Sequence, residues 1–149
     1  MLRKKLSVWR MISISGTPEF FECRFEGILP NKSNSRRIFR AGGGRHFIAK
    51  APEAIAFVDW FCREVASRKL PFVMGERLGI SVYITPTDMR RDLDIELLCD
   101  ALQCAGIVAN DRAFWRKRAQ RLEPNKHDPH VSAWVWPIER VDSTIECES

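Results

Sequence analysis

Apolar and polar residues alternate at period two in several short segments, a pattern typical of strands with one buried and one exposed face. The clearest segments are Phe21–Glu26 and Leu78–Ile84, and Val131–Ile138 contains the aromatic and β-branched residues that strands favour. Residues 113–122 fit both a strand and a helix, and we predict a strand there.

A hairpin and two helices complete the predicted elements. Short strands at Arg36–Arg40 and Arg45–Ile48 flank three glycines and predict the hairpin. The first helix begins at Pro52. Its apolar stripe consists of Ile55, Val58, Phe61, Cys62 and Val65. The second helix follows Asp92 and ends at Gly106, where a left-handed cap fits. Its apolar residues are Leu93, Leu97, Ala101 and Ala105.

The order strands, helix, strand, helix, strands predicts an α/β or mixed α+β architecture, with helices packed on a mixed sheet. We expect a single domain over residues 1–149, with flexible ends at 1–8 and 140–149. The sequence has no apolar run long enough to cross a bilayer and no secretory apolar stretch, so we expect a cytoplasmic protein without a membrane partner. The five cysteines contain no CxxC pair, which favours reduced thiols over disulfides or a zinc site.

The net charge of +5 is unevenly distributed along the chain. Residues 32–50 hold six basic residues and no acid, and residues 112–126 hold six basic residues and one acid. Concentrated basic charge suits a polyanionic backbone, because neutralised phosphates release their counterions. Charge alone fits equally well with two solvated basic surfaces that bind nothing.

The most informative stretch is the acidic segment Asp92–Asp94, which follows Arg90 and Arg91. If its backbone is extended, the two carboxylates point the same way about 6 to 7 Å apart, and magnesium or manganese can bridge them. If it is helical, the side chains diverge, and Asp94 then serves only as a helix cap. Asp111 follows the helix after a short connection and is the candidate third carboxylate. A metal held by such acids activates water for phosphodiester hydrolysis.

Four strings around these acids occur in a characteristic order. They are NKSNSRR at 31–37, RDLD at 91–94, DALQ at 100–103 and AGIVAND at 105–111. The last three resemble the DLD, DAL, AG and DD string of the RusA family of Holliday-junction resolvases, and the first resembles the family's basic N-terminal loop. The resemblance covers residues 21–138, and its string is far more specific than an isolated DxD.

The resemblance implies a RusA-like α/β fold in a homodimer, often prophage-borne, that cleaves four-way DNA junctions symmetrically with magnesium, for which manganese is expected to substitute. By matching positions it makes Asp92, Asp94 and Asp111 the catalytic, metal-binding acids. The residues expected to grip branched DNA are Lys32, Arg36, Arg37, Arg90, Arg91, Lys117 and Arg118.

The chain departs from the commonest family pattern in the second helix. Ile95 and Leu98 stand where that pattern has an asparagine and a catalytic lysine, and the stretch between Asp94 and Asp100 is shorter. Either another basic residue, Lys117 or Arg118, supplies the charge, or activity is reduced. The alternative function is therefore a catalytically weak or inactive junction-binding or architectural DNA protein of the same fold.

Other candidate groups have plainer interpretations. Glu96 and Asp100 are candidate ligands of a second cation or members of a solvated helix face, and Asp88 is expected in a turn. Among the tryptophans, Trp115 is the best candidate for a base-stacking wedge, because basic residues surround it. The three histidines are expected at the surface rather than in catalysis. They are His46, His127 and His130.

Overall fold

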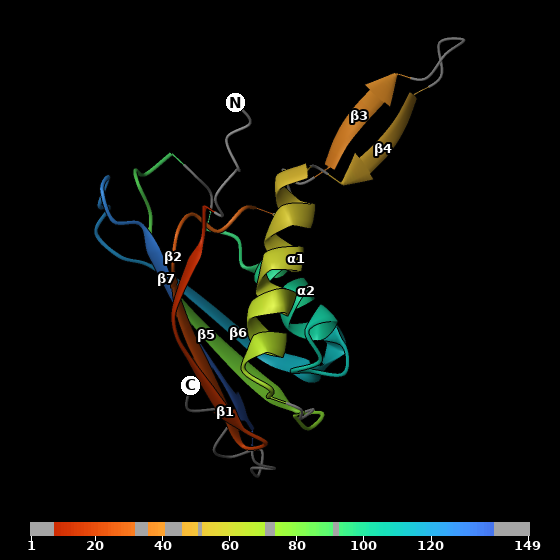
Figure 1. Ribbon diagram of the computed structural model, residues 1–149, viewed down its shortest axis with the longest axis vertical. Coiled ribbons are helices and arrows are strands. Elements are labelled where there is room, and N and C mark those ends of the chain that lie inside the picture. Colours follow the sequence, from red (N-terminus) through yellow and green to blue (C-terminus); the bar gives the residue numbers. More distant parts are fainter. Residues whose placement is uncertain are drawn as a thin grey trace, which may run out of the picture.

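The protein is a mixed α+β domain in which two helices lie on one side of a five-stranded sheet (Figure 1). The computed structural model describes residues 8–31, 36–40, 46–50, 52–70, 74–90 and 93–138. The sheet has the spatial order β1 (Arg10–Thr17), β2 (Phe20–Glu26), β7 (His130–Pro137), β5 (Leu78–Thr85) and β6 (Phe114–Arg121). β5 and β6 are parallel, and the other neighbours are antiparallel. The predicted α+β architecture with a mixed sheet is therefore confirmed.

A separate two-stranded sheet is formed by β3 (Arg36–Arg40) and β4 (His46–Lys50), which pair antiparallel. This confirms the predicted hairpin, although its glycine turn lies outside the described residues. Figure 1 shows the hairpin beyond the N-terminal end of α1 (Pro52–Ser67). Among the described residues, no helix is both long and apolar enough to span a bilayer.

The core lies between the sheet and the two helices, and a cluster of aromatic rings forms the part of it against α1. Phe57 and Trp60 of α1 contact Phe25 of β2, with ring centroids 5.7 and 5.4 Å from it. The expected stripe on α1 is partly wrong, because Ile55 is 47% exposed whereas Phe57 is fully buried. The helix is apolar around much of its circumference, and the large rings take the inward face because they remove the most apolar surface from water.

The second helix, α2 (Glu96–Cys104), is the crossover that joins the parallel strands β5 and β6. It begins later than predicted, and Leu93 lies before it with 39% of its surface exposed. Gly106 adopts a φ of 83°, which confirms the predicted left-handed termination. The connection to β6 then passes through a short 3₁₀ turn, η2 (Asp111–Ala113), which lies against α2.

β1 was not predicted, because a bulge interrupts its alternation. The register with β2 shifts between Met11 and Ser13, so Met11 is buried while Ile12 is exposed. An extra residue in one strand moves the inward-facing positions from odd to even numbers. No single period of two therefore describes this strand.

Gly27 fixes the path of the chain as it leaves β2. It has a φ of 122°, and its N–H donates to the carbonyl of Pro129 at 2.8 Å. A Cβ there would lie 2.6 Å from Cδ1 of Trp9, whose Nε1 donates to the Ile28 carbonyl at 2.8 Å. The segment after β2 is thus held against the end of the sheet.

Replacing Gly27 with alanine is expected to cost roughly 3 kcal/mol, because backbone strain and the clash with Trp9 add. Gly106→Ala is the matched control, since it meets no heavy atom within 4 Å and carries only the left-handed backbone cost of about 1 kcal/mol. Urea unfolding of both variants measures the difference. Equal losses of unfolding free energy in the two variants would show that the contact with Trp9 does not constrain position 27.

Candidate functional site

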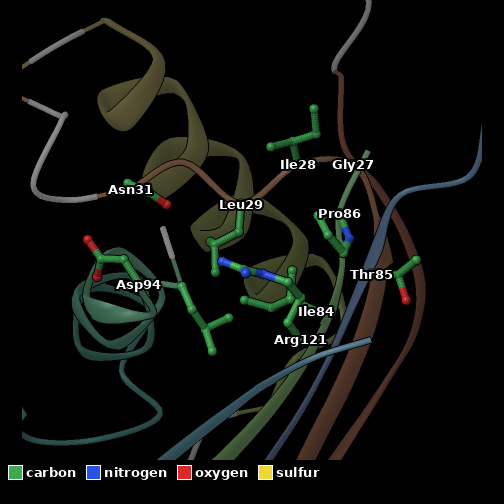
Figure 2. Close-up of a pocket in the computed structure, with 10 residues that line it drawn as sticks. Gly27, Ile28, Leu29, Asn31, Ile84, Thr85, Pro86, Asp94 and Arg121 are labelled. Atoms are coloured by element: carbon green, nitrogen blue, oxygen red, sulfur yellow. The ribbon is translucent and has the colours of Figure 1, made fainter. Parts of the chain in front are cut away.

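A pocket at the end of β5 brings together segments that are far apart in the sequence. Its walls come from the segment after β2, the end of β5, the residues before α2 and the last residue of β6. They are Gly27, Ile28, Leu29, Asn31, Ile84, Thr85, Pro86, Leu93, Asp94 and Arg121. Figure 2 shows the Arg121 side chain reaching from the end of β6 toward the side on which Asp94 and Asn31 lie. We call this the Asp94 pocket.

Asp94 stands immediately before α2, in non-helical backbone. Residues 93–95 are outside the helix, and Oδ1 of Asp94 accepts a hydrogen bond from the N–H of Glu96 at 2.9 Å. This bond closes an Asx turn just ahead of the helix, whose N-cap is Ile95 without a side-chain cap hydrogen bond, so Asp94 does not occupy the capping position that the sequence left as an alternative. A carboxylate has two oxygens with about four acceptor positions, so this bond through Oδ1 is compatible with metal binding.

The other two predicted acids are only partly described. Asp92 lies outside the described residues, and Asp111 is described as the first backbone position of η2 without its side chain. Among the described residues, no three His, Cys, Asp or Glu side chains gather to hold a metal, and that set lacks Asp92 and the Asp111 carboxylate. Convergence of the three acids therefore stays a prediction.

The register of β6 divides its basic residues between the two faces of the sheet. Lys117 and Arg121 pair with Ile80 and Ile84 of β5, whose alternation with Gly79 and Ser81 places them on the helix side. Nζ of Lys117 lies 2.8 Å from Oε2 and 3.0 Å from Oε1 of Glu96, the first residue of α2.

Arg118 pairs with Ser81 and so belongs to the opposite face from Lys117. Lys117 and Arg118, the two residues considered as substitutes for the lysine of the commonest pattern, therefore lie on different faces of the sheet. Glu96 is a partner of Lys117 and its side chain is 48% exposed, which fits the solvated helix face that was one of its two expected roles. Arg121 was not expected at the site, although its spacing of four from Lys117 places both on one strand face.

The remaining predicted DNA-binding residues are distributed as follows. Arg36 and Arg37 lie in β3, and Arg90 is exposed with its N–H bonded to Oδ1 of Asp88 at 2.8 Å, which confirms Asp88 in a turn. Lys32 and Arg91 lie outside the described residues.

His130 holds the ends of two strands together. Its Nδ1 lies 2.9 Å from the Asp128 carbonyl, an acceptor only, so Nδ1 carries the proton and donates. Nε2 lies 3.3 Å from Oγ1 of Thr85, within hydrogen-bond distance. This bonding gives His130 a structural role at a partly buried position, whereas a surface position was expected. His127 is exposed, and His46 begins β4.

The described cysteines form no disulfide, as expected. Burial, aided by the Glu22 carboxylate, raises the pKa of Cys23 to about 12, so this thiol stays protonated. Burial also raises the pKa of Cys62, with smaller contributions from Cys104 and Asp59.

Neither protein-family models nor curated protein sequences match this chain. The function therefore has to be argued from the site.

Leu98, the position where the commonest family pattern has a lysine, belongs to the core. Its side chain is fully buried, together with Leu97 and Leu102 of the same helix. A lysine at this position would point into the buried core, and residue 98 does not line the Asp94 pocket.

We expect Leu98→Lys to lower the free energy of unfolding by more than about 3 kcal/mol, because an unpaired ammonium loses its hydration. Leu98→Met nearly conserves volume and should cost less than about 1.5 kcal/mol. Urea unfolding curves of the two variants provide the measurement. A Leu98→Lys protein as stable as the Met variant would mean that its ammonium reaches solvent.

Proposed function

We propose that the protein is a magnesium-dependent endonuclease that resolves four-way DNA junctions, of the RusA type that the sequence resembles. One observation carries this proposal. Asn31, where the basic loop at 31–37 begins, and Asp94, from the acidic segment, line the same pocket. The start of the basic loop and the acidic segment, two separate parts of the sequence that carry the resemblance, therefore meet at one pocket.

The donor chemistry at this place suits magnesium. Carboxylate oxygens are the ligands that magnesium prefers, and Asp94 is half-buried beside the pocket. In the proposal Asp92, Asp94 and Asp111 hold the ion. The bound ion supplies a water of lowered pKa and offsets the charge that develops on the phosphorus.

Two backbone features support the convergence of the acids. Residues 93–95 lie outside the helix, so the helical arrangement in which the two side chains diverge does not hold at Asp94. The η2 turn that begins at Asp111 lies against α2, so the chain after the helix returns toward it.

Lys117 is the residue that we assign as the positive charge of the site. It lies on the helix side of β6 and reaches the first residue of α2, two positions after Asp94. Arg121 adds a second cation at the pocket. These cations and the basic loop hold the DNA phosphates, and this contact supplies affinity without reading sequence.

Symmetric cuts across a junction need two sites related by a twofold axis, so we propose a homodimer. A junction-binding protein without turnover is the second candidate. The observation that favours it concerns position 98, where the commonest pattern has a lysine. Here the residue is a leucine buried in the core, so this position supplies no positive charge to the site.

A labelled four-way junction incubated with the protein and magnesium should receive paired, symmetric nicks. Asp92→Asn and Asp94→Asn should each slow cleavage by more than about 100-fold, since even outer-shell partners of a metal are worth about 10-fold to 100-fold. Binding should persist or tighten, because one negative charge facing the DNA is lost.

Asp88→Asn is the matched control, because asparagine keeps the oxygen that accepts from Arg90, and this variant should cleave normally. Junction binding without nicks at any magnesium or manganese concentration would establish the second candidate. Parallel loss of binding and cleavage in the Asp92 and Asp94 variants would contradict the metal assignment.

We expect Lys117→Ala to lower kcat by about 10-fold to 100-fold with little change in the KM for junctions, and Lys117→Arg to restore part of the loss. Arg118→Ala, on the other face of the sheet, should leave kcat unchanged. The Lys117–Glu96 pair is partly exposed, with side-chain exposures of 34% and 48%, so its loss should cost at most about 1 kcal/mol of stability. Steady-state cleavage by the three variants measures these effects, and equal kcat for both alanine variants would exclude Lys117.

A further inference from the structure

The face of the sheet opposite the helices carries aromatic and basic residues in register. On β5 this face presents the small residues Gly79 and Ser81, followed by Tyr83. Gly79 lies between Trp136 of β7 and Arg116 of β6, and Ser81 lies between Trp134 and Arg118. We call these residues, Tyr83, Arg116, Arg118, Trp134 and Trp136, the open face.

The aromatic rings of the open face pack against one another and against the backbone. A Cβ on Gly79 would lie 2.7 Å from the Trp136 ring, so this indole covers the strand closely. Tyr83 and Trp134 make an edge contact at 5.4 Å, and Nε1 of Trp134 donates to Oε2 of Glu22 at 3.1 Å. The rings are therefore held in fixed positions while remaining partly exposed.

The border of this face is also aromatic and basic. Trp115, next to Arg116 at the start of β6, is 61% exposed, and the guanidinium carbon of Arg77 lies 4.4 Å from its ring centroid. Phe20, which starts β2, is 41% exposed. Figure 1 shows both helices on the other side of the sheet, so among the described elements no helix covers the open face.

We propose that the open face binds unpaired nucleotides of single-stranded DNA, with bases stacking on its rings and Arg116 and Arg118 contacting the phosphates. Rigid aromatic rings beside arginines are what single strands require, since any base offers a π-face and the backbone a regular row of charges.

The charges on β6 favour this occupant over a second copy of the chain. This edge strand carries Arg116, Lys117, Arg118 and Arg121 and no acid, so two copies brought together along it would repel each other. A polyanion is instead attracted to this strand, because each contact neutralises a phosphate and releases counterions.

This surface is separate from the Asp94 pocket, which lies on the helix side, and it does not depend on nuclease activity. A protein that contacts an opened branch point can hold duplex arms and unpaired strands at different places. Binding at the open face needs no metal, so the experiment is done in EDTA.

The test uses a thymidine 20-mer and a 20-base-pair duplex, titrated into the full chain while tryptophan fluorescence is followed. We expect the single strand to bind more tightly than the duplex and to quench the fluorescence, because only unpaired bases stack. Arg116→Ala with Arg118→Ala should weaken binding about 10-fold and reduce the salt slope by about 1.4, which is about 0.7 for each phosphate contact.

Three further variants locate the effect. Trp134→Phe keeps a stacking ring, so it should reduce the quenching while the Kd stays within about twofold. Arg68 is an exposed cation at the end of α1, and Arg68→Ala is the matched control. This variant should change neither the quenching nor the Kd. Asp94→Asn should also bind the single strand normally, which separates this result from any failure of the nuclease proposal.

Three results would overturn the proposal. These are a duplex that binds as tightly as the single strand, quenching that the Trp134→Phe variant retains in full, and a Kd unaffected by loss of both arginines. Sedimentation that shows a wild-type dimer dissociating when Trp136 is replaced by alanine would instead identify the open face as an interface between copies.

Discussion

The parallel pairing of β5 with β6 is the constraint on which the arrangement of the candidate site depends. Parallel neighbours cannot be joined by a tight turn, and α2 supplies the crossover that they need. The crossover brings Asp94 to the end of β5, and the register brings Lys117 and Arg121 to the same side. A shift of β6 by one residue would exchange them with the arginines of the open face.

Most elements of this fold follow from local patterns in the sequence. β2, β5 and β7 alternate cleanly, and Pro52 and Gly106 mark helix ends by their backbone preferences. β1 escaped this reasoning because its bulge breaks the period. The buried face of α1 was partly misjudged, because two overlapping apolar stripes fit the helix and only packing against Trp9 and Phe25 decides between them.

Of the candidate site, the sequence located one acid that lines the pocket, Asp94, but not the residues around it. The position of Asp94 before a helix follows from its neighbours in the sequence, whereas its proximity to Asn31 depends on the path that Gly27 imposes after β2. The inward direction of Leu98 likewise depends on where α2 begins, which the sequence placed too early. Long-range packing decides both features, and neither has a local signature.

The charged edge of the sheet also bears on how copies of the protein behave toward one another. An unpaired edge strand is a template for intermolecular sheet growth, and cations along it are a common protection. On β6 the protecting residues include those proposed to contact nucleic acid. A bound polyanion therefore neutralises the very charges that keep two edges apart, and high ionic strength screens them in the same way. If the proposed DNA binding holds, colloidal stability and DNA occupancy are coupled through one strand.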